Sequence, residues 1–140
     1  MLLQKPIWHK RLSNIDLKQQ PNQLDDKYVN NGFHIYKSSW DDLRKVLNPY
    51  FATICSGNSL YSKHQDKDKL DKIVENWNSG IALIPPMLIH LPDNTLFPAD
   101  GKHRMKAAFV GDRSEIYFIL FDIDLLSINN PLGVIKLFGF

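Results

Sequence analysis

The sequence predicts an α+β fold, a small mixed sheet with helices packed on it. Two segments carry most of this prediction. Residues 66–78 place apolar side chains at the spacing of one helix face, and residues 115–122 form a continuous apolar run of strand length. The order between and around them is helix, strand, turn, strand, helix, strand. A chain of 140 residues is long enough for one such domain with a real core, so we expect a single domain over residues 1–140.

Composition places the chain among ordinary globular proteins and limits its partners. Hydrophobic residues make up 44% and charged residues 23%, and the net charge is only +2. Binding to nucleotides or nucleic acid would therefore depend on a local basic patch. The single cysteine, Cys55, excludes an internal disulfide and suits a reducing compartment. No apolar run approaches the ~20 residues of a membrane span. We therefore expect a cytoplasmic protein with no membrane partner.

The N-terminal quarter predicts an arm followed by a hairpin. Residues 1–27 are polar with scattered apolar positions, which indicates an N-terminal arm. The pair Asn31-Gly32 is typical of a type I′ turn, which needs positive φ at both central residues. Its strands would be residues 28–30 and 33–36.

A helix is expected directly after the hairpin. The Ser39 hydroxyl can cap its start, and Asp42 follows three positions later. Trp40, Leu43 and Leu47 share one face, and Pro49 ends the helix.

The helix over 66–78 follows a polar loop at 52–65. Its apolar positions fit one helix face, and they are Leu70, Ile73, Val74 and Trp77. Gly80 ends it. The mixed-charge run 62–69 is typical of a solvated helix start, with contact to a phosphate as the alternative. We interpret the three tryptophans of the chain as core anchors, and they are Trp8, Trp40 and Trp77.

Strand signals dominate the rest of the chain. Residues 85–91 and 96–99 predict two strands joined by the turn PDNT, with Pro98 marking a strand end or an edge position. A short helix is expected from Lys102 to about Val110. The run 115–122 then predicts a buried central strand. The apolar tail 125–140 is expected either to add one more strand or to pack as a cap.

The segment PADGKHRMKAA, residues 98–108, carries the chemistry. A strand ends, Gly101 turns the chain, and a helix begins with Lys102, His103 and Arg104, where acids usually balance the helix dipole. Without a ligand each base costs roughly 0.3–1 kcal/mol there, and a bound phosphate reverses the sign. Free amides of a first helical turn, with lysine and arginine, commonly hold phosphate. The alternative is that these side chains are solvated and turned away from the helix end.

The segment DGKHRMKAA, with the two-stranded unit before it and FVGDRSEIYFILFD after it, resembles the ParB/sulfiredoxin fold. In that family a Gly-x-x-Arg-type motif opens a helix after a strand–turn–strand unit, and a glycine and a closing strand follow. The correspondence covers residues 70–122, which would form a ParB-like core. It implies that Gly101, Lys102, His103 and Arg104 bind the phosphates of a nucleoside triphosphate, ATP or CTP.

The resemblance leaves several activities open. Sulfiredoxins carry a cysteine where Lys102 stands, which argues against reduction of a sulfinic acid. The expected activity is hydrolysis or transfer of a nucleoside triphosphate's phosphate. The alternatives are metal-dependent DNA cleavage of the plasmid or phage type, with DNA as the partner, and a non-catalytic ParB-like interaction module.

Hydrolysis or phosphoryl transfer needs a group that orients the nucleophile and a divalent ion. Carboxylates are natural ligands for Mg²⁺. The candidate catalytic residues are Asp100 beside the phosphate site, His103 within it and Glu75 on the preceding helix. Asp122 and Asp124, past the closing strand, are weaker candidates, and every one of these acids also fits a plain surface role. The five histidines show no metal-ligand spacing, so no metal site built by the protein alone is predicted.

Overall fold

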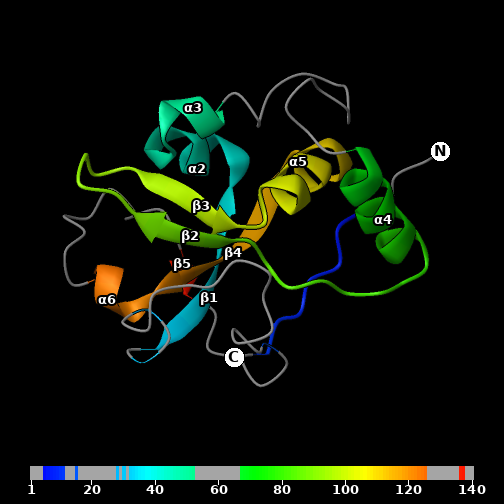
Figure 1. The fold of residues 1–140 in the computed structure, drawn as a ribbon, viewed down its shortest axis with the longest axis horizontal. Helices are drawn as coiled ribbons and strands as arrows, with labels where there is room; N and C mark the ends of the chain where they lie inside the picture. The colour runs from blue at the N-terminus through cyan, green and yellow to red at the C-terminus, as the bar shows by residue number, and fades with distance from the viewer. Residues whose placement is uncertain are drawn as a thin grey trace.

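Five strands form one mixed sheet in the order β3-β2-β4-β1-β5 (Figure 1). The computed structural model describes residues 5–11, 15, 28, 30, 32–52, 67–125 and 136–137. The strands are β1 (Phe33–Ser39), β2 (Met87–His90), β3 (Leu96–Asp100), β4 (Glu115–Phe121) and β5 (Lys136–Leu137). The pairs β1·β4, β1·β5 and β2·β3 are antiparallel, whereas β2 and β4 run parallel. The predicted α+β class is confirmed.

Helices lie between most of these strands along the chain. They are α2 (Trp40–Val46), α3 (Pro49–Ala52), α4 (Lys67–Asn78), α5 (Lys102–Gly111) and α6 (Asp122–Leu125). The connection from β2 to its parallel neighbour β4 runs through β3 and α5, so α5 is the crossover helix of the parallel pair. None of the helices in the described ranges is long and apolar enough to cross a membrane.

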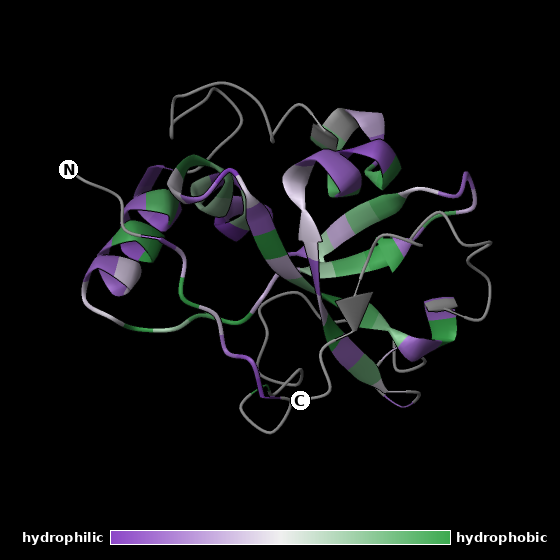
Figure 2. Ribbon diagram, turned by 180° about the vertical axis from the view of Figure 1, so that it is seen from behind, coloured by the Kyte–Doolittle hydropathy of each residue, from purple (hydrophilic) through white to green (hydrophobic). Residues whose placement is uncertain are grey.

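Helices α2 and α5 lie against one face of the sheet, and α4 packs on α5 (Figure 1). Alternate residues of β4, among them Ile116, Phe118 and Leu120, belong to one hydrophobic cluster with buried residues of these three helices. The remaining β4 residues face a second cluster on the opposite side, which includes Ile35 and Met87. Seen from behind, α4 shows hydrophilic and hydrophobic residues in turn along its length, as an amphipathic helix does (Figure 2).

Most predicted elements of the second half of the chain are confirmed, and so is one helix cap in the first half. The four apolar residues of α4 are buried, and β4 is the predicted buried central strand. Pro98 lies within β3 at the edge of the sheet, where a missing amide hydrogen is tolerated. The tail adds β5, which pairs with β1. The cap of α2 is also confirmed, because the Ser39 hydroxyl accepts a hydrogen bond from the Asp42 amide.

The predicted hairpin around Asn31-Gly32 is wrong. Tyr28 and Asn30 are helical, and β1 pairs with β4 and β5 instead of with residues 28–30. Gly32 does have a positive φ, at 90°. Its carbonyl, however, accepts a hydrogen bond from the amide of Asp122, the residue that follows β4, so the turn contacts β4 and not a hairpin partner. A turn signal specifies local backbone only, whereas the partner strand is chosen by burial over the whole sheet.

Two further boundaries differ from the prediction. The helix after Ser39 ends at Val46, and Pro49 begins α3 instead of ending α2, in keeping with the preference of proline for the first helical turn. Residues 5–11 are part of the fold and not a loose arm, because Trp8 is buried and forms a parallel bridge with Leu83. Most of the predicted loop 52–65 lies outside the described residues.

Candidate functional site

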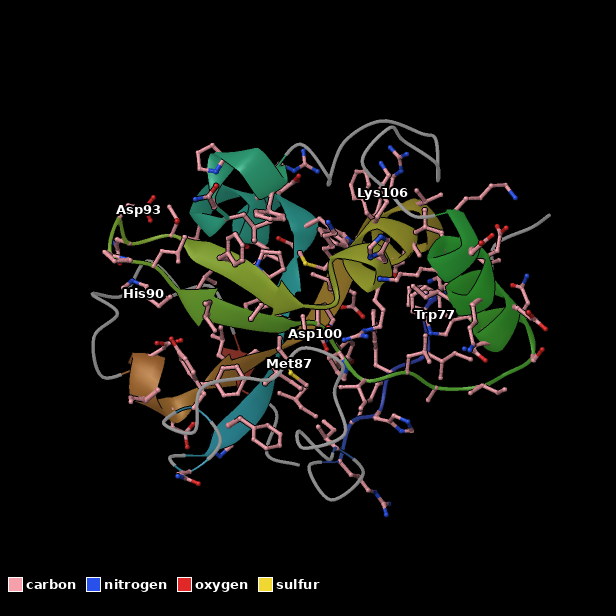
Figure 3. The ribbon with its side chains drawn as sticks, in the orientation of Figure 1. Trp77, Met87, His90, Asp93, Asp100 and Lys106 are labelled. Atoms are coloured by element: carbon pink, nitrogen blue, oxygen red, sulfur yellow. The ribbon has the colours of Figure 1, made fainter. Side chains whose placement is uncertain are left out.

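The predicted phosphate motif lies where β3 gives way to α5. Asp100 is the last residue of β3 (Figure 3). Gly101 is the residue before the first turn of α5. No side chain caps this helix start, and its first turn holds no acidic residue. Lys102 is exposed, whereas His103 and Arg104 are half-buried. The start of α5 and these three basic residues therefore lie together at the junction with β3.

Gly101 adopts a conformation that side chains disfavour, with φ at 98° and ψ at 20°. A Cβ atom there would stand 2.8 Å from the Cα of Pro86 and 2.8 Å from Nη2 of Arg104. The contact with Pro86 is a contact with the backbone, so it could be relieved only by moving the chain. Position 101 therefore needs glycine for its backbone angle and also for the close approach of its neighbours.

A pocket of about 530 Å³ opens at this point, between α4 and α5. We call it the α4–α5 pocket. Its lining combines charged, polar and apolar residues from α4, β3, the turn and α5: Lys69, Lys72, Ile73, Asn76, Leu83, Pro98, Ala99, Asp100, Gly101, Lys102, His103 and Arg104. The lining holds four lysine or arginine side chains and a single carboxylate, so the pocket has an excess of positive charge.

Helix α4 supplies one wall of the pocket, and the sequence had indicated only one residue of that wall, as an alternative. Lys69, Lys72 and Asn76 all line it, and their spacing of three and four residues puts them on one side of the helix. Lys69 belongs to the run in which contact with a phosphate was an alternative, and its position in the lining agrees with that alternative. The other two were missed, although their spacing beside the apolar face was a readable signal.

The carboxylate of Asp100 is paired within the pocket. Nη2 of Arg104 lies 3.3 Å from Oδ2 of Asp100, and the two side chains are only 18% and 9% exposed. Nε of Arg104 is buried and has no hydrogen-bond partner among the described residues. The arginine is therefore held at one point of its guanidinium and keeps further donor capacity.

The remaining candidate acids lie outside the pocket. Glu75 is exposed on α4 and does not line it. Asp122 accepts a hydrogen bond from Nδ1 of His34 at 2.7 Å, and Asp124 accepts one from the amide of His90 at 3.0 Å. Both Asp122 and Asp124 serve local structure at the end of β4. Of the predicted catalytic residues, the structure brings only Asp100 and His103 into the pocket.

One tyrosine that lies outside the pocket has a shifted pKa. Burial raises the pKa of the Tyr36 phenol, and the negative charge of nearby Asp122 raises it further. Tyr36 belongs to β1 and does not line the α4–α5 pocket, so this shift does not bear on the pocket.

The other predicted features have mixed outcomes. Trp8, Trp40 and Trp77 are all buried, so their interpretation as core anchors is confirmed. Cys55 lies outside the described residues. Within the described ranges, no group of three or more histidine, cysteine or acidic side chains could hold a metal ion.

A second hollow of about 460 Å³ lies between residues 5–11 and the start of β4. Its lining holds three basic side chains, of Lys5, Lys10 and Arg11, and two acidic ones, of Asp112 and Glu115. The excess of positive charge is smaller here than in the α4–α5 pocket, which is therefore the stronger candidate for an anion site. Comparison of the chain with protein-family models, with curated proteins and with solved structures finds no match.

Proposed function

We propose that this protein binds the phosphates of a nucleoside triphosphate, ATP or CTP, in the α4–α5 pocket and hydrolyses or transfers a phosphate there. The observation that carries the proposal is the composition of that pocket: an uncapped helix start and four cationic side chains around about 530 Å³. A single anion needs fewer positive charges than this. A chain of phosphates matches both the number of cations and their placement on two helices.

The order of elements supports a ParB/sulfiredoxin-like fold as part of the same proposal. Helix α4, the pair β2 and β3, helix α5 and strand β4 follow one another in the order that the resemblance implies. The Gly101–Arg104 motif stands at the junction of β3 and α5. The proposed roles are backbone approach for Gly101 and charge or hydrogen bonds for Lys102, His103 and Arg104.

Two residues are placed to act on the reaction. In hydrolysis, the oxygen of water attacks the terminal phosphorus and the bond to the bridging oxygen breaks. Asp100 or His103 would orient the water and take its proton, since both line the pocket. The Asp100 carboxylate is also of the type that Mg²⁺ prefers, and a bound Mg²⁺ would neutralise charge on the phosphates.

Thermal unfolding with ATP, CTP, GTP and ADP, each with and without magnesium, tests the proposal. At a hundred times its Kd a ligand stabilises the native state by about 2.7 kcal/mol, so at least one nucleotide should raise Tm by several degrees. Arg104→Gln should weaken that nucleotide about 10- to 100-fold, because a charge-assisted hydrogen bond is lost.

Lys102→Gln and Lys45→Gln form a matched pair. Both lysines are exposed at the surface, but only Lys102 lines the pocket. The first change should lower affinity and the second should leave it unchanged. Release of inorganic phosphate from the bound nucleotide then reports hydrolysis. If no nucleotide stabilises the protein while supercoiled plasmid is nicked, the nuclease alternative replaces this proposal.

A further inference from the structure

The side chain of Arg104 is bent back over the turn that precedes its own helix. Its Nη2 atom lies 3.3 Å from Asp100 and 2.8 Å from the place where a Cβ of residue 101 would stand. Side chains on a helix point toward its N-terminus. The missing side chain of Gly101 leaves the space through which the guanidinium reaches the carboxylate.

This contact occupies the groups that the ligand needs. Asp100 is the only carboxylate in the lining of the pocket as the structure describes it, and it is directed at the arginine of the phosphate motif. Without a ligand, a buried arginine with no counter-charge is costly, and the Asp100 contact reduces that cost. With a ligand, the same carboxylate repels the phosphates and competes for the guanidinium.

We infer that Asp100 is a built-in counter-ion that holds Arg104 in the empty pocket and is exchanged for phosphate when the ligand binds. This inference rests on the proposed function and adds an autoinhibitory contact to it. The contact is a single hydrogen bond at 3.3 Å, and Nε of Arg104 has no partner among the described residues. A phosphate can offer two acceptors to the guanidinium, so exchange replaces a one-point contact by a two-point contact.

The size of the effect follows from the fraction of time that Arg104 is held. If Asp100 holds the arginine for about 90% of the time in the empty pocket, the apparent affinity for the ligand is lowered about tenfold. Removing the charge of Asp100 should restore most of this tenfold loss of affinity. Magnesium must be absent from the measurement, because a divalent ion would itself neutralise the carboxylate.

Calorimetric titration with inorganic tripolyphosphate and with ATP, both in EDTA, tests the inference. Asp100→Asn should bind tripolyphosphate about 3- to 10-fold more tightly than the wild type. Asp68→Asn is the matched control, since Asp68 is exposed on α4 and does not line the pocket. It removes the same charge and should change the affinity less than twofold.

A second measurement needs no variant of Asp100, whose replacement could impair folding. The Nε–H signal of Arg104, assigned by its loss in Arg104→Lys, is followed by NMR while tripolyphosphate is added to the wild-type protein. Exchange of partners predicts a clear shift of this signal that saturates together with binding. A signal that stays in place at saturation overturns the inference.

The outcomes separate this inference from the proposed function. If the wild type binds and Asp100→Asn binds equally or more weakly, the counter-ion role is refuted and the proposed function stands. If only Asp100→Asn binds, the contact blocks the pocket and the inference is supported. If neither protein binds tripolyphosphate or ATP, both ideas fail.

Discussion

Gly101 is held by two independent constraints, its positive φ of 98° and the Pro86 backbone 2.8 Å from its would-be Cβ. Gly80 has a similar φ of 78°, but nothing lies within 4 Å of a Cβ there. A substitution at Gly80 therefore tests backbone strain alone, whereas one at Gly101 tests strain and steric collision together. Gly80→Ala should cost about 1–2 kcal/mol of unfolding free energy, from the left-handed conformation alone. Gly101→Ala should cost roughly 2–4 kcal/mol, because overpacking is added.

Urea unfolding of both variants measures this difference. Gly101→Ala should also weaken tripolyphosphate binding, since Arg104 and the backbone turn both have to move. Equal losses of stability in the two variants would mean that the turn relaxes around the new methyl group, contrary to this account.

At the scale of single residues, the sequence predicted the motif but not its internal pairing. The glycine and the three basic residues after it were readable, because their charges conflict with the helix dipole. The contact between Asp100 and Arg104 passes over Gly101, where Arg104 and Pro86 both lie within 3 Å of the place of a Cβ atom, and the local sequence does not show that these groups meet there. Lys72 was missed because a lysine beside the apolar face of a helix usually serves only solubility.

Among the elements, α2 depends on its cap. The Ser39 hydroxyl accepts a hydrogen bond of 3.1 Å from the Asp42 amide, and the helix buries Trp40, Leu43 and Val46. Ser39→Ala should lower the unfolding free energy by about 1 kcal/mol, while Ser39→Thr should restore most of it.

Chemical unfolding checks the Ser39 variants, with Ser79→Ala as the control. Ser79 is exposed beyond the end of α4, and its replacement should stay within about 0.5 kcal/mol. Equal values for Ser39→Ala and Ser79→Ala would show that packing of Trp40 alone fixes the start of α2.

Elements with a strong internal period were predicted well, and elements defined by a distant partner were not. The apolar spacing of α4 specifies which side is buried without reference to the rest of the chain. The segment after Gly32 has a strand pattern, but its register with β4 joins residues 88 positions apart in the pair Phe33 and Phe121. Nothing in the local sequence favours that partner over a hairpin.

On the scale of the whole molecule, residues 5–11 pack against α4 and Leu83, which form part of the wall of the α4–α5 pocket. The rings of Trp8 and Trp77 meet edge to face, with centroids 5.1 Å apart, and the indole of Trp77 donates to the carbonyl of Ile7. Leu83, which lines the pocket, exchanges backbone hydrogen bonds with the carbonyl of Ile7 and the amide of His9. The sequence indicated Trp8 as a core anchor, but it did not indicate that residues 5–11 pair with Leu83, because backbone hydrogen bonds leave no side-chain pattern.

Trp8→Ala should therefore cost about 3–5 kcal/mol of unfolding free energy, the range for loss of a large buried aromatic side chain. It should also weaken tripolyphosphate binding, because α4 and Leu83 lose the surface against which they are positioned. Trp8→Phe keeps an edge-to-face contact and should fall between the wild type and Trp8→Ala in both measurements. Ile81→Ala is the control for apolar truncation, since Ile81 is 51% exposed, and it should change neither quantity appreciably. A Trp8→Ala protein as stable as Ile81→Ala would mean that residues 5–11 only cover the surface, and α4 would then have to be held by α5 and the sheet alone.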